Sequence, residues 1–464
     1  MKNNPNLNRD SPVVNFVNQC FWYFYLLILI VISFVNQASY SVEWLVIYAL
    51  IFMNAGLYCG FRCLVKKPLY LLFNTRLAIA ILTMMLVWLV LQCLVPTSSY
   101  LSAHLFGVNQ AQWFSYSNVW SVTPEKTQWA VLVQLTMMTL FIMTLALLDR
   151  RRRVKQLLYV LILVGAAHAL IAVTTKYLDL FLVNKESLDG HFNAARGLFV
   201  NRNHLAAFIT LCLTSALAIQ LKLLMKNQTS SLKAMLFKQV FNISFFLLLL
   251  AFIALVLSES RGAFLSFILS LVVYIGFIKK SHRKSIHKTF ILMSMTVLMS
   301  VVVLLFGQGI LARFSGHAFS LGERVTQWEI TWQAIKYEWL FGYGVGSYEL
   351  VFQSFRKFSD LRLVVYDQAH NDFLHIFLEQ GLFGLMLWLS FIYVSLRYAI
   401  RSYFISHSTL ERSVLLSILI TVSALLIQSL VDYQLQIMTI RCYFFVIMAM
   451  AFAVPMMSSG YIKR

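Results

Sequence analysis

Four short segments hold the polar residues whose types and spacing are suited to chemistry. They are ARGLFVNRNHLAAF at 195–208, SESRGAF at 258–264, AHNDFLHIFLEQGLFG at 369–384 and LVDYQL at 430–435. Each segment lies where a long apolar stretch begins or ends, so its charged side chains meet the edge of a membrane. Charges at such an edge are costly unless they pair, bind a ligand or reach the head groups.

Arginines in two of these segments are suited to binding a diphosphate. Arg196, Arg202 and Arg261 carry guanidinium groups, whose planar fork matches the oxygens of a phosphate. The alternative role for an arginine at a membrane edge is contact with lipid head groups through a snorkelling side chain. Arg261 lies in a tight turn between two apolar stretches, and this position favours ligand binding over snorkelling.

His370 is the residue best suited to moving a proton, because the pKa of histidine lies close to neutral pH. Beside an anion-binding group of arginines, it could take the proton of an attacking hydroxyl while the arginines steady the charge of a departing diphosphate. The alternative is a structural role. The AHND context is typical of a helix start, with Asn371 or Asp372 as the capping residue.

Five further polar residues are expected to support the site: Asn203, Glu259, Asn371, Glu379 and Asp432. Glu379 falls about two turns into an apolar stretch, where an unpaired carboxylate is costly, so we expect it to pair with a polar group. Asp432 has capping of the last helix as its alternative role. His375 follows His370 by five residues, about 140° around a helix, which argues against a two-histidine metal face. We predict neither a metal site nor a cofactor.

The elements that must position these residues are membrane helices. The chain has 464 residues, of which 60% are hydrophobic and 12% charged, and its mean hydropathy is +0.74. A soluble protein has roughly 25% charged residues. Apolar runs of spanning length recur along the chain, without the alternation of an outer-membrane barrel. We therefore predict an all-α, polytopic, GT-C-like bundle of about 12 transmembrane helices.

The apolar runs place these spans at 20–36, 42–58, 77–95, 129–148, 157–175, 203–221, 240–257, 262–278, 289–306, 373–396, 413–430 and 439–457. Their connections predict the orientation, because cytoplasmic loops carry an excess of Lys and Arg. With the N-terminus in the cytoplasm, every inside connection is basic, and the inside holds 25 of the 38 basic residues. The net charge of +20 is thus explained by topology and implies no nucleic acid. This orientation places all four polar segments and both long connections outside.

The chain divides into residues 1–306 with nine spans, a periplasmic loop domain at 307–372, and residues 373–464 with the last three spans. Within the loop domain, 321–340 has helical periodicity. Its apolar residues predicted to share one face are Val325, Trp328, Trp332, Ile335 and Trp339. The pattern is typical of an amphipathic helix on the membrane surface, and a small folded cap is the alternative. Residues 96–128 form the other long outside connection.

Three of the four segments also resemble the motifs of a known family, the O-antigen ligase and Wzy-type polymerase superfamily. RGLFVNRN at 196–203 is similar to its arginine and Gly-x-Phe-x-Asn-x-Asn segment, and SESRG at 258–262 to its Ser-x-Ser-Arg-Gly turn. HNDFLHIFLEQGLFG at 370–384 resembles its His-Asn-x-x-Leu entry helix with Glu-x-Gly-x-x-Gly. VDYQL at 431–435 is similar to its late Asp-Phe-x-Leu segment. The resemblance covers roughly 190–440.

The resemblance implies a bacterial inner-membrane enzyme with its active site in the periplasm and both termini in the cytoplasm. The donor would be a glycan on undecaprenyl diphosphate, held by Arg196 and Arg261 with Arg202 as a further candidate. His370 would activate or orient the acceptor hydroxyl. No metal is implied. The acceptor would be lipid A–core in a ligase, another repeat unit in a polymerase, or Ser or Thr in a protein O-glycosylating member.

The choice among these acceptors depends on a groove that the sequence does not identify, and we favour a ligase. Protein-glycosylating members often carry a soluble tail, and the chain ends seven residues after its last predicted span. A secondary transporter or flippase is a different class that also suits twelve spans. Transporters commonly carry broken helices or ionisable groups at mid-membrane. Here the charged residues gather at one face, which favours the enzyme.

Overall fold

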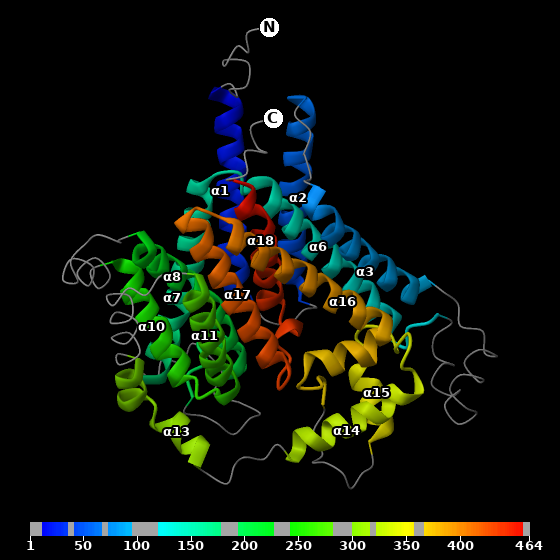
Figure 1. Cartoon of the computed structure of the whole chain (residues 1–464). Helices are drawn as coiled ribbons and strands as arrows, with labels where there is room; N and C mark the ends of the chain where they lie inside the picture. The colour runs from blue at the N-terminus through cyan, green and yellow to red at the C-terminus, as the bar shows by residue number, and fades with distance from the viewer. Residues whose placement is uncertain are drawn as a thin grey trace.

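The computed structural model describes residues 12–35, 41–66, 73–94, 119–177, 194–226, 242–281, 299–315, 322–356 and 366–457. The regular structure of this part of the chain is helical (Figure 1). Trp113 and Tyr116, in the first long connection, lie outside the described residues.

Nine helices in these ranges are long and apolar enough to cross a membrane. They are α1 (Pro12–Phe34), α2 (Val42–Leu64), α3 (Arg76–Leu94), α6 (Pro124–Leu147), α7 (Arg151–Tyr177), α8 (Arg202–Lys226), α16 (Asp372–Ile405), α17 (Thr409–Ser429) and α18 (Met438–Met456). Two further apolar helices, α10 (Ile243–Leu257) and α11 (Arg261–Ser281), occupy the predicted spans 240–257 and 262–278, and the apolar stretch found in α11 is Arg261–Val272. The predicted span at 289–306 lies partly outside the described residues. The all-α polytopic bundle is confirmed.

Helices α8 and α18 lie at the centre of the bundle, with 89% of their spanning residues buried in protein. Helix α8 packs against α7, α10 and α17, while α18 packs against α6, α16 and α17. A helix that is apolar on all sides is suited to such a position, since it has no polar face to turn outward. The two ends of the bundle are then set by these central helices.

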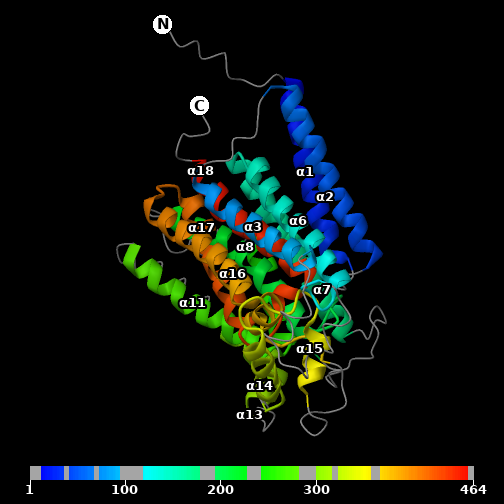
Figure 2. The ribbon, with the colours of Figure 1, turned by 90° about the vertical axis from the view of Figure 1, so that its right-hand side faces the viewer.

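One end of the bundle joins the starts of α1, α7 and α17. Arg153 Nη2 donates to the Asn18 carbonyl at 2.9 Å, and Arg151 lies 3.3 Å from the Glu411 carboxylate. At the opposite end lie three further helices, α13 (Gln308–Ser315), α14 (Gly322–Tyr337) and α15 (Tyr348–Phe355), as Figures 1 and 2 both show. The basic α6–α7 turn and the predicted loop domain are therefore at opposite ends of the molecule.

Helix α16 is broken at Gly381, where φ is +68°. The break exposes backbone groups, and the 339–344 segment satisfies them. Leu382 N donates to the Trp339 carbonyl at 2.8 Å, and the Glu379 carbonyl accepts from Gly344 N at 2.8 Å. A Cβ at position 381 would lie 2.3 Å from the Leu340 carbonyl oxygen, so the close approach requires glycine.

Helices α14 and α15 pack with the start of α16 around a small core of their own. We call this unit the cap. Buried residues of this core include Ile330, Ala334, Tyr348 and Phe352. A helix is thus confirmed at Gly322–Tyr337, within the predicted 321–340, and the residues predicted to share its apolar face differ in their exposure. Ile335 is buried, whereas Val325, Trp332 and Trp339 are exposed in the protein surface. The small and branched residues fit the interior of the cap, and Trp332 of the same helix faces outward.

Candidate functional site

The loop between α17 and α18, residues 430–437, is the point at which the four polar segments meet. Asn371 Nδ2 donates to the Leu430 carbonyl at 2.9 Å. Asn203 Nδ2 donates to Asp432 Oδ2 at 2.7 Å. A Cβ on Gly262 would lie 3.3 Å from a Val431 methyl group, so the SESRG turn is in contact with the same loop. Segments separated by more than 200 residues are thereby brought to one end of the bundle.

His370 and Asp432 form the central pair of this cluster. His370 Nδ1 lies 3.1 Å from Asp432 Oδ1. The Asp432 side chain is 3% exposed and the His370 side chain 28%, so the carboxylate is enclosed while the imidazole reaches the surface. Because an ionised carboxylate only accepts hydrogen bonds, Nδ1 carries the proton and Nε2 of a neutral His370 is the acceptor. This tautomer suits a base.

Asp432 is held in its charged form. Burial raises the pKa of the Asp432 carboxyl, but the hydrogen bond from His370 and the positive charges of His370, Arg324 and His204 outweigh burial and hold the pKa well below its usual range. Its Oδ1 also accepts from Tyr433 N at 3.0 Å. Asp432 therefore supports His370 and does not cap α18, which begins six residues later.

Tyr433 separates two histidines. Its ring lies edge-on to His370, with ring centroids 4.9 Å apart, and edge-on to His204 at 4.8 Å. His204 is buried in the first turn of α8, and its charge also contributes to the low pKa of Asp432. The imidazole of His370 is thus held by a carboxylate on one nitrogen and by an aromatic ring at its side.

The three predicted phosphate-binding arginines lie at the same end of the bundle, in different settings. Arg202 is the first residue of α8 and is buried beside Asn203, whereas Arg261 is the first residue of α11 and is half-buried. Arg196 is half-buried in the segment that leads to α8, and its Nη1 donates to the Val200 carbonyl at 3.5 Å. That segment is tied to the end of α10 through Ala195 N and the Leu257 carbonyl, 2.9 Å apart.

Three helix N-termini also point toward this end of the bundle. Helices α8, α11 and α16 begin at Arg202, Arg261 and Asp372, each next to a residue that contacts the 430–437 loop. The first turn of a helix carries unsatisfied N–H groups and the positive end of the helix dipole, which favour anions. The arginine side chains and the helix N-termini therefore both favour binding of an anion at this end of the bundle.

The predicted supporting residues divide into two groups. Asn203 and Asn371 contact the 430–437 loop, and Asn371 also caps α16 by accepting from Phe373 N and Leu374 N. Glu259 has φ of +54° and lies 3.3 Å from Lys176 Nζ, so it ties the SESRG turn to the end of α7. Glu379 belongs to the cap, as the next paragraph describes.

Glu379 has the polar partner that its buried position requires. Its Oε2 lies 3.3 Å from His375 Nε2, and its Oε1 accepts from Gly346 N at 2.8 Å and Tyr348 N at 3.2 Å. These contacts join the first half of α16 to the glycine-rich segment before α15. Glu379 therefore supports the cap that carries His370 and lies apart from the His370–Asp432 pair.

Comparison with known proteins relates part of the chain to a family. Residues 246–389 match the family model Wzy_C, described as O-antigen ligase. The match over this region supports the O-antigen ligase and Wzy superfamily. The search of curated proteins finds no match. The family indicates an O-antigen ligase-like or polymerase-like function, with a polyprenyl-linked glycan as donor and a glycan or lipid as acceptor.

The Wzy_C match spans only part of the cluster. It contains Arg261 and His370, together with Glu259, Asn371 and Glu379. The remaining predicted site residues, which lie outside the match, are Arg196, Arg202, Asn203 and Asp432. The Wzy_C region thus supplies the histidine and one arginine, and the flanking helices supply the carboxylate partner and the other two arginines.

Two residues of this cluster were not predicted from the sequence. Arg324, in the first turn of α14, donates from Nη1 to the Val431 carbonyl and contributes to the low pKa of Asp432. Tyr433 packs against His370. Tyr433 lies within the predicted LVDYQL segment, so it could have been found there. Arg324 lies in an amphipathic helix whose polar face gives no sign of its partner.

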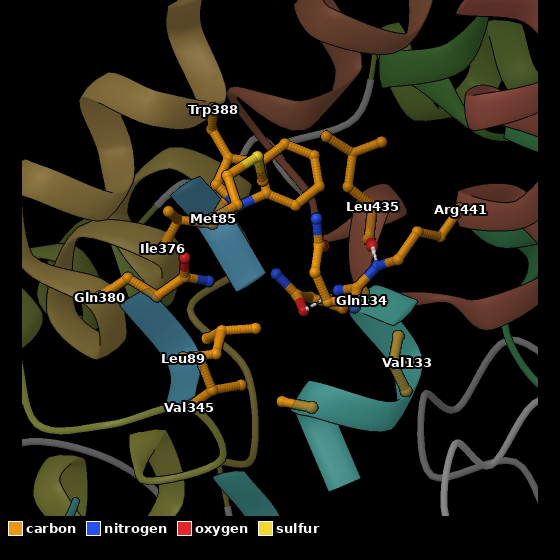
Figure 3. A pocket seen from close by; sticks show the side chains of 12 residues that line it. Met85, Leu89, Val133, Gln134, Val345, Ile376, Gln380, Trp388, Leu435 and Arg441 are labelled. Atoms are coloured by element: carbon orange, nitrogen blue, oxygen red, sulfur yellow. Dashed lines mark hydrogen bonds between the residues drawn. The ribbon is translucent and has the colours of Figure 1, made fainter. Parts of the chain in front are cut away.

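A small polar hollow lies on the other side of the 430–437 loop, between α3, α6, α16 and α18 (Figure 3). Gln134, Gln380, Gln436 and Arg441 line it with apolar neighbours, and its space of about 20 Å³ holds roughly one water molecule. It contains none of the predicted site residues. Among the described residues, no group of three or more His, Cys, Asp or Glu side chains is placed to hold a metal ion.

Proposed function

We propose that this chain transfers a glycan from undecaprenyl diphosphate to an acceptor hydroxyl on the periplasmic side of the bacterial inner membrane. The observation that carries the proposal is the His370–Asp432 hydrogen bond of 3.1 Å, at the end of the bundle where Arg202 and Arg261 begin their helices. The family match supports the same class of reaction. The basic connections at the opposite end support a periplasmic site.

The proposed step uses the two sides of the cluster differently. The acceptor hydroxyl attacks the anomeric carbon of the donor sugar, and His370 Nε2 takes its proton. The bond between that carbon and the diphosphate oxygen breaks, and the diphosphate keeps the electron pair. Asp432 stabilises the resulting imidazolium, because it stays ionised in its hydrogen-bonded site. Every atom of the step comes from donor, acceptor or His370.

The arginines would stabilise the diphosphate as its charge develops. Arg261 and Arg196 offer forked donors from two segments, and Arg202 adds a third from the start of α8. The N-termini of α8 and α11 reinforce them with backbone N–H groups and the helix dipole. Such preorganised groups accelerate the reaction only if they interact more strongly with the departing diphosphate than with the bound donor.

We further propose that the acceptor is lipid A–core, as in a ligase, with polymerisation of repeat units as the alternative. The test is transfer by the purified protein in nanodiscs, supplied with an undecaprenyl-diphosphate glycan and lipid A–core. Product on lipid A–core is the expected result. Longer glycans that remain on the polyprenyl carrier would instead identify a polymerase. Absence of both products, with a folded protein and an intact donor, would contradict the proposed reaction.

A further inference from the structure

The backbone of His370 has an unfavourable conformation that its surroundings must hold. Its φ of +45° lies in the left-handed region, which is costly for a residue with a side chain. Such a conformation persists only where neighbouring contacts fix the chain on both sides. On the C-terminal side, Asn371 caps α16 and also bonds the Leu430 carbonyl. The contacts on the N-terminal side come from a different helix.

The second turn of α14 holds the two residues that precede His370. Gln327 Nε2 donates to the Gln368 carbonyl, and Trp328 Nε1 donates to the Ala369 carbonyl at 2.9 Å. Carbonyls at consecutive positions are thereby fixed by adjacent residues of one helix. These bonds on one side of His370, and the N-terminal capping of α16 by Asn371 on the other, hold its backbone conformation.

The first turn of α14 holds the chain beside Asp432, the partner of His370. Arg324 Nη1 donates to the carbonyl of Val431, the residue before Asp432. Positions 324, 327 and 328 are spaced by three and four residues, so their side chains leave α14 on one face. One helix face therefore contacts the chain immediately before the histidine and the chain immediately before its carboxylate.

Helix α14 is itself held in place by packing and hydrogen bonds, so the side chains that make these contacts start from a fixed backbone. Ile330, Ala334 and Ile335 are buried in the core of the cap. Thr331 and Gln327 also bond the Tyr348 hydroxyl of α15, at 3.0 and 3.3 Å. A shift of α14 would thus require repacking of the cap.

We propose that Arg324, Gln327 and Trp328 are positioning residues that set the geometry of the His370–Asp432 pair from the periplasmic cap. The inference rests on the proposed function for its catalytic meaning. None of the three contacts the reacting atoms. They fix the backbone that orients the imidazole, so their loss lowers kcat while donor binding at the arginines is retained. The cap is then a part of the active site and not a cover over it.

Arg324 separates this role from that of the phosphate-binding arginines. The Val431 carbonyl is a single acceptor, which an ammonium group can also satisfy, whereas a diphosphate is matched by the guanidinium fork. We therefore expect Arg324→Lys to retain most activity and Arg324→Gln to lose at least tenfold in kcat. A merely structural role for Arg324 would be seen instead as an equal loss of folded protein in both variants.

The deciding experiment compares Trp328→Phe with Trp332→Phe in the full-length protein. Trp332 lies four residues along the same helix, 46% exposed, and serves as the matched control. Two quantities are measured: kcat and KM for the donor, and the rate at which diethyl pyrocarbonate modifies His370, resolved by mass spectrometry. Trp328→Phe is expected to lower kcat at least fivefold at unchanged KM and to raise the His370 modification rate at least threefold. The control is expected to match wild type in both.

The two measurements distinguish failure of the positioning role from failure of the proposed function. If wild type transfers no glycan but Trp328→Phe still speeds His370 modification, the positioning role holds and the proposed function is wrong. If Trp328→Phe and Arg324→Gln match wild type in kcat and in His370 modification, the positioning role is overturned.

Discussion

Replacing Asp432 by asparagine tests the central pair while keeping its shape. The amide oxygen still accepts from His370 Nδ1 and Tyr433 N, and the Asn203 amide can reverse to avoid opposing donors. What is lost is the negative charge beside the imidazolium that forms when His370 takes a proton. We therefore expect a lower kcat at a donor KM close to that of wild type, and a lower unfolding temperature, because the ionised carboxylate also stabilises the fold.

The size of the loss follows from the geometry. Two unit charges about 4 Å apart at an effective dielectric constant of about 20 interact by about 4 kcal/mol. Because the His370 side chain is 28% exposed, water screening is taken to halve this energy. The remaining ~2 kcal/mol corresponds to a fall in kcat of about 30-fold.

The assay is the initial rate of glycan transfer by purified protein at saturating donor and acceptor. Glu349→Gln is the matched control, since this carboxylate forms an exposed ion pair with Lys126 at 3.5 Å and should leave the rate unchanged. A kcat for Asp432→Asn within threefold of wild type, in a folded protein, would refute the role of the charge.

The pH dependence of the wild type has a definite sign. The folded-state pKa of Asp432 is lowered, so its ionisation stabilises the protein above about pH 4 and this contribution is lost only as the pH falls further. Between about pH 5 and 9 Asp432 therefore stays charged. We expect Asp432→Asn to lower the rate throughout that range, because the charge that it removes is present at every pH there; a loss of rate confined to one part of the range would contradict the assignment.

Three further predictions concern the arginines, the break in α16 and the orientation. Arg196→Lys and Arg261→Lys should each lower transfer at least tenfold, because an ammonium lacks the guanidinium fork; full activity in both would exclude a diphosphate clamp. Gly381→Ala should lower the unfolding temperature in a thermal melt, since its Cβ would meet the Leu340 carbonyl, whereas Gly56→Ala, with open space around it, should not. A cysteine in place of the exposed Gln353, in a cysteine-free background, should react with an impermeant thiol reagent in intact spheroplasts; labelling only after lysis would reverse the proposed topology.

The sequence was most informative about features governed by hydrophobicity. Nine predicted spans coincide with long apolar helices and two with shorter ones, because length and apolarity decide whether a segment crosses a membrane. The ends were less accurate. Helix α1 begins at Pro12 and not at residue 20, since its first turns are mixed in polarity.

The break in α16 could not be read from its sequence. Residues 373–396 form one apolar run, yet the helix turns at Gly381 because the glycine-rich 339–344 segment pairs with its backbone. That pairing joins segments about 40 residues apart. Periodicity placed the buried Ile335 on one face of α14 with the exposed Val325 and Trp332, since it marks apolar residues and does not distinguish a protein core from a membrane surface.

The candidate site residues were chosen from the sequence by residue type. The sequence did not show that they lie together. His370, Asp432 and Asn203 were each expected to act, but nothing in the sequence joins Asn203 to Asp432, a contact across 229 positions. Arg324 was missed because arginine on the polar face of a helix is ordinary. Long-range contacts of this kind depend on how the bundle packs, which local patterns do not specify.

The most direct test of the central claim is glycan transfer from an undecaprenyl-diphosphate donor by purified wild type and by His370→Ala, measured side by side in the same nanodiscs. The account predicts transfer by the wild type and a loss of at least a thousandfold in the variant, with donor binding retained. Transfer by His370→Ala at a rate close to that of the wild type would contradict it, because the proton would then have to be taken by another group.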